Sequence, residues 1–525
     1  MTPRLNRFRL LALAVLLLAL AVRLWDLRAR SLWFDEATEY WVATAPYSHV
    51  IASARTGTGD PPLYALLLHT WMQAGSGEAW LRLLSVLASV AGVAGVMVLA
   101  NLFSGGTAAV CAGLLLALLP ADVRYAQEAG QYAFVPAAVA WNLVCLLRMM
   151  REGTWRWVLG WTATALLASY LYYATVFPIA AAFLCVIAEG VLRRDMRVRR
   201  ATGTALLLYI IGILPILISY LPTQVARVVE AGSVSTPEMN TYSGFVGLLR
   251  LKWERACELL GFQFTGWPHT HVPPVVVIVP VVLLMIFAAP RARRLFVWFI
   301  VALASYAAAN AAGLFPLGYR WGMILTPLII CVIAAGATAG GKRTRPATLA
   351  ALLLLVAVSA YSLPNRTLRD RVYPDPTGAW PETEDVRMVA NFWMAHRQPS
   401  QPTYVYYGAA PAFAYYTRSV APRQGLPSTW QLACWHDTNP PAFCRDDNIY
   451  YGRWLRRFDS NEKIASVFNT LEARPDSLWF VFGHLVPGDD RDMVNGLKYQ
   501  GYRVAAAVEG INASACFMVR ERQHP

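Results

Sequence analysis

The sequence has few charged residues for its length. Only 15% of its 525 residues are Asp, Glu, Lys or Arg, whereas a soluble globular protein carries about 25%. Hydrophobic residues make up 56% of the chain, and they are concentrated in long runs before residue 364. A soluble fold is therefore excluded for most of the chain. The distribution predicts a membrane domain over residues 1–363 and a soluble domain over residues 364–525.

Motifs that would indicate several other functions are also absent. The sequence has no Gly-rich phosphate loop, no nucleophile elbow and no metal-type spacing among its eight cysteines. A net charge of +14 would suggest nucleic acid for a soluble protein. Here the basic residues lie in short loops without interleaved aromatic residues, so we expect no nucleic-acid partner. Cys434 and Cys444 are candidates for a disulfide in an oxidising compartment, with Cys516 as a third candidate.

Long apolar runs predict eleven transmembrane helices, since about 20 apolar residues span the hydrocarbon core. The expected spans are 8–25, 80–103, 106–121, 130–149, 155–172, 174–192, 202–221, 273–290, 294–314, 321–340 and 346–363. With the N-terminus inside, most Arg- and Lys-rich loops also fall inside, as the positive-inside rule requires. Arg23, Arg28 and Arg30 are the exception, because they fall outside. The odd number of spans puts residues 364–525 outside.

Residues 364–525 alternate between helical and strand patterns. Helices are expected at 382–396 and 465–471, and strands at 403–407, 478–482, 503–508 and 516–519. This pattern predicts a small α/β domain.

The first outer loop, residues 26–79, contains two adjacent carboxylates, Asp35 and Glu36, directly after Trp33 and Phe34. Charges at a bilayer edge are costly unless solvated or paired, and for that reason are often functional. A carboxylate there can act as general base on an acceptor hydroxyl. Alternatively, the two carboxylates only stabilise the N-terminus of a short interfacial helix.

Two more acidic residues lie on the outer side. Asp60 precedes a double proline and Tyr64, so it is either the cap of a helix or a substrate contact. Glu128 lies in the segment that connects two spans, four residues after Arg124. It is either paired with that arginine or part of a site.

Tyr319 and Arg320 stand at the outer start of the tenth span. A guanidinium there matches the geometry of a lipid phosphate, and an interfacial anchor is the structural alternative. His269 and His271 form a His-x-His pair without an evident third metal ligand.

The order of these motifs resembles the membrane glycosyltransferases of the GT-C class. The resemblance is to family 39, which includes protein O-mannosyltransferases and the aminoarabinose transferases of lipid A. It covers residues 1–340 and rests on Ser31-Leu-Trp-Phe-Asp35-Glu36-Ala, Asp60-Pro-Pro-Leu-Tyr64, Leu81-Arg82-Leu83-Leu84-Ser85, Tyr125-Ala-Gln-Glu128 and Tyr319-Arg320. It implies a polytopic α-helical fold, here with about 11 transmembrane helices and a C-terminal periplasmic α/β domain.

The resemblance also implies roles for single residues. Asp35 occupies the position of the family's catalytic base, Glu36 that of its partner, and Glu128 that of a second acid near the reaction centre. Arg320 matches a cation that faces the carrier phosphate. Weaker candidates for substrate binding are Asp60, Tyr64, Arg82, Arg124 and Tyr319.

Two positions depart from the aminoarabinose transferases. Those enzymes have an arginine where this chain has Thr38, and a lysine where it has Asp60. Both of the missing cations help to bind the carrier phosphate there. The departures therefore argue against that donor and allow an acceptor contact at Asp60.

The implied reaction transfers a sugar from a polyprenyl-phosphate carrier, with inversion, on the periplasmic face of a bacterial inner membrane. The acceptor would be a glycolipid, a polysaccharide or a protein. The reaction needs no cofactor, and a divalent metal ion stays an open alternative. A lipid or sugar transporter or flippase is the alternative function, although transporters normally show internal repeats and charges at the membrane midplane. A membrane subunit without activity is a third possibility.

Overall fold

The computed structural model describes residues 3–56, 61–219, 257, 260–266, 272–311, 320–372, 384–417, 448–452, 460–471, 473–484 and 489–521. Contacts within the chain divide it into two units. The first unit comprises Met1–Trp25, Gly59–Tyr64 and Arg82–Arg366. The second comprises Asp26–Thr58, Ala65–Leu81 and Thr367–Pro525. The first outer loop thus belongs mainly to the same unit as the C-terminal domain.

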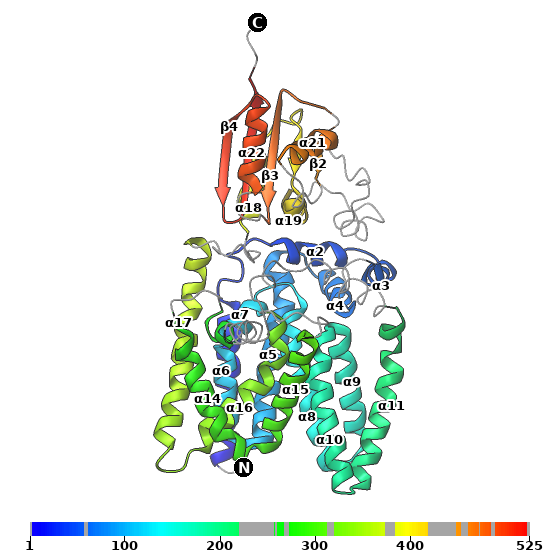
Figure 1. Cartoon of the computed structure of the whole chain (residues 1–525), viewed down its shortest axis with the longest axis vertical. Coiled ribbons are helices and arrows are strands. Elements are labelled where there is room, and N and C mark those ends of the chain that lie inside the picture. Colours follow the sequence, from blue (N-terminus) through cyan, green and yellow to red (C-terminus); the bar gives the residue numbers. More distant parts are fainter. Residues whose placement is uncertain are drawn as a thin grey trace. The chain divides into compact units, whose positions relative to one another are not determined.

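Apolar helices that run alongside one another make up the first unit (Figure 1). They are α1 (Pro3–Leu24), α5 (Glu78–Ser104), α6 (Gly106–Ala117), α7 (Pro120–Ala126), α8 (Phe134–Glu152), α9 (Trp155–Leu171), α10 (Val176–Leu192), α11 (Met196–Ser219), α14 (Pro274–Arg291), α15 (Arg293–Ala311), α16 (Thr326–Ala339) and α17 (Arg345–Val372). Short 3-10 helices precede three of them: η1 (Gln131–Ala133), η2 (Tyr173–Thr175) and η4 (Arg320–Leu325).

The described part of the chain has eight helices that are long and apolar enough to cross a membrane. A ninth span results if the bent pair α6 and α7 is taken as one. The chain is therefore a multi-pass membrane protein. Helices α1 and α9 coincide with the two other predicted spans, and α9 has 17 residues.

The predicted span 106–121 is broken rather than continuous. Helix α6 ends at Ala117, and α7 begins at Pro120 after a bend of 60°. Proline has no N–H for the helical ladder but is well suited to the first turn of a new helix. The apolar composition of this segment hides the break, because both halves are buried.

Helices α14 and α16 approach each other closely at Gly336. A Cβ atom built at that position would overlap the carbonyl oxygen of Leu284. Lipid tails are as apolar as Leu side chains, so membrane helices associate through close packing, and small residues at the contact make it possible. The close contact between α14 and α16 therefore requires a residue without a side chain at position 336.

The second unit combines three short helices of the first loop with a mixed sheet. The short helices are α2 (Phe34–Ala43), α3 (Tyr47–Thr56) and α4 (Leu63–Met72), of which α4 begins in the first unit. The sheet contains β1 (Thr403–Val405), β2 (Ile449–Tyr451), β3 (Ser477–Gly483), β4 (Tyr502–Gly510) and β5 (Ala513–Arg520). Its helices are α18 (Val386–His396), α19 (Ala410–Thr417), α21 (Ser460–Leu471) and α22 (Asp489–Tyr499).

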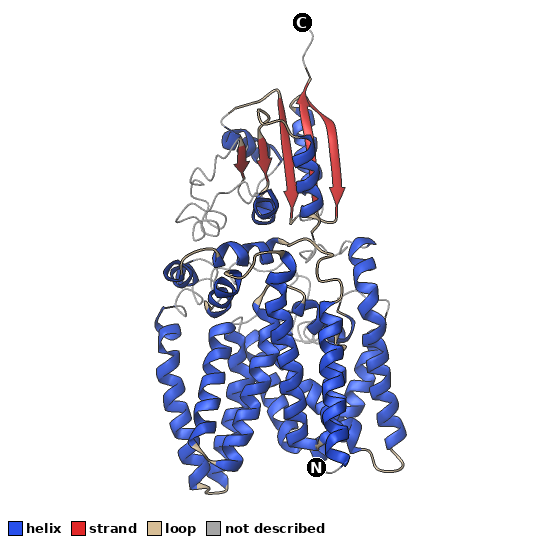
Figure 2. Cartoon of the chain, turned by 180° about the vertical axis from the view of Figure 1, so that it is seen from behind, coloured by secondary structure: helices blue, strands red, loops and turns tan. Residues whose placement is uncertain are grey.

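The strand order is β2-β1-β3-β5-β4 (Figure 2). Strand β1 pairs in parallel with β2 and β3, whereas β5 pairs antiparallel with β3 and β4. Tyr404, Phe480 and Met518 from the sheet pack with Val467 and Leu497 from the helices in one buried core. The two predicted helices and four predicted strands of this domain are confirmed, and β2, α19 and α22 are additional.

We expect Gly336→Ala to lower the midpoint of thermal unfolding in detergent. The added methyl group overpacks the contact between α14 and α16, at a cost of about 1–3 kcal/mol. Gly203→Ala in α11 is the matched control, because a Cβ atom there meets nothing within 4 Å. The control should unfold at the wild-type temperature or slightly above it, since Ala favours a helix. Equal midpoints for the two variants would contradict this account of the packing.

Candidate functional site

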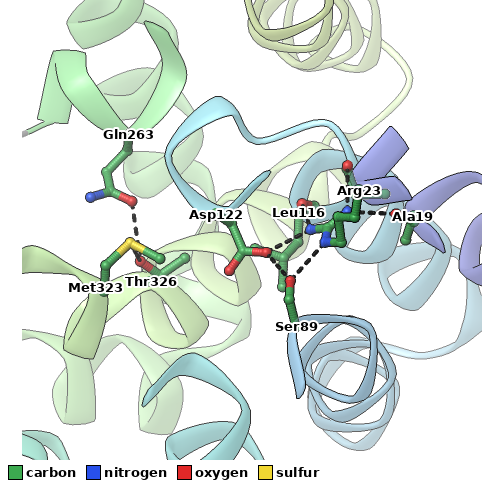
Figure 3. A network of polar contacts seen from close by, with 9 residues as sticks. Ala19, Arg23, Ser89, Leu116, Asp122, Gln263, Met323 and Thr326 are labelled. Carbon is green, nitrogen blue, oxygen red and sulfur yellow. Dashed lines mark hydrogen bonds and ion pairs between the residues drawn. The ribbon is translucent and has the colours of Figure 1, made fainter. Parts of the chain in front are cut away.

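A buried arginine holds the first unit together at the break between α6 and α7. Arg23, in the last turn of α1, has no exposed surface. Its guanidinium donates five hydrogen bonds, one for each of its N–H groups (Figure 3). The acceptors are Oγ of Ser89 at 2.7 Å, the carbonyl oxygens of Ala19 at 3.0 Å, Ala117 at 2.9 Å and Leu116 at 3.1 Å, and Oδ2 of Asp122 at 2.6 Å.

These contacts connect four helices. Leu116 and Ala117 belong to the end of α6, and Asp122 lies in the first turn of α7. A cation at a helix C-terminus and an anion at a helix N-terminus are both favoured by the helix dipoles. Ser89 on α5 completes the network by donating to Asp122 Oδ2 at 2.5 Å.

The network also explains one exception to the predicted topology. Arg23 was expected at the outer end of the first span, where its charge opposed the positive-inside rule. The structure shows it inside the helical bundle, with its charge neutralised by Asp122 at 2.6 Å. A buried, paired arginine is not a free loop charge, and so it does not count in that rule.

Helix α7 carries one predicted site residue, Arg124, and a second, Glu128, lies two residues beyond its end. Arg124 and Glu128 are both buried, and Arg124 Nε lies 4.0 Å from Glu128 Oε1. Arg124 Nη1 donates to the carbonyl oxygen of Gly266 at 3.0 Å, and its guanidinium lies 5.9 Å from the ring of Phe262. The predicted pairing of these two residues is therefore present. This pairing is compatible with either a structural or a catalytic role.

A row of tyrosine rings runs from Arg124 to Arg320. Tyr125, next to Arg124, has its ring centroid 5.4 Å from that of Tyr132. Tyr132 lies 5.7 Å from Tyr172, and its hydroxyl accepts a hydrogen bond of 3.4 Å from Arg320 Nη1. The Arg320 guanidinium also lies 5.4 Å from the Tyr132 ring centroid. The structure thus links Arg320 through Tyr132 to Tyr125, the sequence neighbour of Arg124.

Other predicted residues of the first unit are placed as follows. Arg82 is buried on α5, and Tyr64 is buried with its ring edge-on to Phe134 at 5.6 Å. Asp60 and Tyr319 lie outside the described residues, as do His269, His271, Cys434 and Cys444. Among the residues that the structure describes, no three His, Cys, Asp or Glu side chains form a group able to hold a metal ion.

Asp35 and Glu36 lie in the first turn of α2, in the second unit. Glu36 is buried, and Asp35 is half-buried. The backbone on their N-terminal side is held by the C-terminal domain. The Leu32 N–H donates to the hydroxyl of Tyr416 at 2.6 Å, and the Ser31 hydroxyl donates to the carbonyl oxygen of Glu384.

A second set of contacts holds the same loop at its two ends. Arg387 Nη1 lies 2.8 Å from Glu78 Oε2, and Arg387 Nη2 donates to the carbonyl oxygens of Arg28 and Ala29. Tyr416 also donates to Glu78. Residues before α2 and residues at the start of α5 are therefore joined through one arginine.

An acid–base pair beside Asp35 was not predicted from the sequence. His484 Nδ1 lies 2.6 Å from Glu384 Oε1, and both side chains are buried. The His484 ring stacks on the Phe34 ring, with 4.7 Å between centroids and 25° between planes. Burial raises the pKa of the Glu384 carboxyl above its ordinary value, although the imidazole of His484 acts against this, and the nearby Asp35 carboxylate raises it further.

One signal in the sequence points to this pair. His484 comes two residues after the end of the predicted strand 478–482, and polar residues after the carboxyl end of a parallel strand often line a site. Whether that strand is parallel cannot be seen from its sequence, which explains why the residue was missed.

Comparisons with known proteins find a similar family for one segment and a similar fold for the whole chain. Residues 59–218 match the model of the family described as dolichyl-phosphate-mannose-protein mannosyltransferase. The crystal structure of ArnT from Cupriavidus metallidurans in the apo state is similar over 98% of both chains, with a TM-score of 0.54 and 13% identity. An oligosaccharyltransferase from Archaeoglobus fulgidus has a TM-score of 0.47 and 13% identity, over 77% of this chain and 61% of its own. A search of curated protein sequences finds no significant match.

The multi-pass helical fold with a mixed-sheet domain is similar to the fold of ArnT over nearly the full length of both chains. Within it, residues 59–218 are similar to the mannosyltransferase family model.

We expect Arg23→Met to destabilise the protein by about 3–5 kcal/mol, because it leaves Asp122 as a buried charge without its cation. The measurement is the thermal unfolding midpoint in detergent. Arg28→Met is the matched control, since the Arg28 side chain is exposed. Adding Asp122→Leu to Arg23→Met should recover part of the loss. An unchanged midpoint for Arg23→Met would show that the network carries no net stability.

Proposed function

We propose that this protein transfers a sugar from a polyprenyl-phosphate donor to an acceptor hydroxyl on the periplasmic face of a bacterial inner membrane. The observation that carries the proposal is the match of residues 59–218 to a family that uses lipid-linked sugars. Asp35, in the first turn of α2, is the proposed general base, and the C-terminal domain holds the backbone three residues before it. The acceptor is a glycolipid, a polysaccharide or a protein.

The proposed topology has eleven spans with the N-terminus inside. It counts α1, α9 and the bent pair α6 and α7 as spans beside the eight helices that are long and apolar enough. The loops that follow α8, α10, α14 and α16 are then inside, and they are rich in Arg and Lys. Residues 364–525 are outside, where no nucleotide sugar is present and a sugar has to arrive on lipid.

The proposed chemistry is a direct displacement at the anomeric carbon. Asp35, with Glu36 as its partner, accepts the proton of the acceptor hydroxyl, whose oxygen attacks the anomeric carbon from the side opposite the phosphate. The bond between the anomeric carbon and the phosphate oxygen breaks with its electron pair, and polyprenyl phosphate leaves. The configuration is therefore inverted. No group other than donor, acceptor and base is needed for this balance.

The leaving phosphate gains charge in the transition state, and a nearby cation stabilises it. Arg320 is the proposed cation, with Arg82 and Arg124 as further phosphate contacts. Support comes from the row of tyrosine rings, which places Arg320 within hydrogen-bond reach of Tyr132 and connects it to the Arg124–Glu128 pair. Asp60, Tyr64 and Tyr319 are proposed as further substrate contacts.

The residue at position 38 bears on the donor. The Thr38 hydroxyl donates to the carbonyl oxygen of Phe34 at 2.7 Å, within its own helix. A short side chain bonded to its own helix cannot replace an arginine that reaches a phosphate. This contact favours a donor other than the aminoarabinose lipid.

The test is transfer by purified protein in detergent, with a panel of short-chain polyprenyl-phosphate sugars and membrane extract as acceptor. We expect Asp35→Asn to lower kcat by about 10²- to 10⁴-fold, the range for loss of a general base. Asp26→Asn is the matched control, because Asp26 is an exposed carboxylate of the same loop with a φ of 59°. Asn adopts that left-handed conformation readily, so the control should keep wild-type activity.

The outcomes separate the parts of the proposal. Turnover that collapses only in Asp35→Asn identifies both the reaction and the donor. Equal turnover in Asp35→Asn and wild type removes Asp35 as the base and leaves Glu36 and Glu128 to be tested. If folded wild-type protein cleaves none of the donors, either the panel lacks the right donor or the proposed reaction is wrong.

A further inference from the structure

The edge of the sheet where the parallel strands end is occupied by the first outer loop. Strands β1 and β3 are parallel neighbours, so Tyr407, just after β1, and His484, just after β3, lie at the same edge. In α/β sheets this edge is where ligands usually bind. Here it receives Phe34, whose ring lies 5.2 Å from Tyr407 and 4.7 Å from His484. Asp35 is the next residue in the chain.

His484 is held in a costly conformation. Its φ is +54°, in the left-handed region, which most residues with a side chain avoid. The backbone of Gly408 packs closely against it, because a Cβ atom built at Gly408 would lie 2.6 Å from the Cβ atom of His484. Such strain persists only where the surrounding structure fixes it, and it is concentrated at functional sites.

Glu384 fixes the imidazole ring from the other side. Its Oε1 lies 2.6 Å from His484 Nδ1, and its carbonyl oxygen accepts a hydrogen bond from Ser31. The charge of the nearby Asp35 also raises the pKa of this carboxyl group. One buried residue of the C-terminal domain therefore contacts the loop at Ser31 and is electrostatically coupled to Asp35.

We infer that Glu384 and His484 are positioning residues for Asp35. The Glu384 carboxylate orients the imidazole, the imidazole holds the ring of Phe34 by stacking, and the position of Phe34 sets that of the adjacent carboxylate. Neither residue takes part in bond making. The inference rests on the proposed role of Asp35, and it gives the C-terminal domain a part in the chemistry beyond covering the site.

His484→Asn separates this role from a purely structural one. Asn is favoured in the left-handed region and its amide can still donate to Glu384, but it has no ring to stack on Phe34. We expect an unfolding midpoint equal to or above that of wild type. We also expect kcat to fall by about 10- to 100-fold, because a small misplacement of a catalytic group has effects of that size. KM for the donor should stay unchanged.

Two further variants keep the test decisive if His484→Asn folds poorly. His484→Phe retains a ring but loses the bond to Glu384, and Phe34→Leu loses the stacking from the other partner. Both should lower kcat, and the double variant of His484→Asn with Phe34→Leu should be no slower than the slower single variant, since both changes break one contact. His396→Asn, at an exposed histidine of α18, is the matched control.

The results distinguish this inference from the proposed function. A wild-type kcat in folded His484→Asn, together with an inactive Asp35→Asn, overturns the positioning role and leaves the base in place. A raised KM with unchanged kcat also overturns it, because that would make the pair a binding element. Wild-type turnover in Asp35→Asn refutes the proposed function itself, whatever the histidine variants do.

Discussion

Burying the Arg23 guanidinium removes its water, so all of its N–H groups need acceptors within the protein. The acceptors come from its own helix and from α5, α6 and α7. Two of them are the carbonyl oxygens of Leu116 and Ala117 in the last turn of α6, where the break interrupts the helical ladder. The break and the arginine thus require each other. The direction of α7 follows from this, and with it the placement of Arg124, Glu128 and the tyrosine rings beyond them.

The sequence was most informative where one physical effect dominates. Long apolar runs place the membrane helices, since burying charge in lipid is so costly that few alternatives exist. The pattern of apolar and polar residues in 403–520 located four strands, because burial likewise dominates the sequence pattern of a strand. The break at Pro120 was missed because apolar composition continues through it, and β2 was missed because three residues are too few to show a pattern.

For the candidate site, contacts between residues close in the sequence could be predicted, whereas contacts between distant residues could not. The pairing of Arg124 with Glu128 was predicted, because a separation of four residues keeps both on one side of a short helical segment. The contacts of Arg23 with Asp122 and of Glu384 with His484 were not, since they join residues about 100 positions apart. Only the fold brings such residues together. In both cases a charged residue in an otherwise apolar or strand-like segment was the available hint.

The first outer loop contacts the C-terminal domain, although the two are far apart in the sequence. Ser31 and its partner Glu384 are 353 residues apart. A ribosome adds about 5–20 residues per second, so the loop emerges roughly 20–70 s before that partner exists. During this interval Asp35 has no structure to hold it. A chain that stops before residue 384 therefore lacks both the contact of Glu384 with Ser31 and the contact of Tyr416 with Leu32.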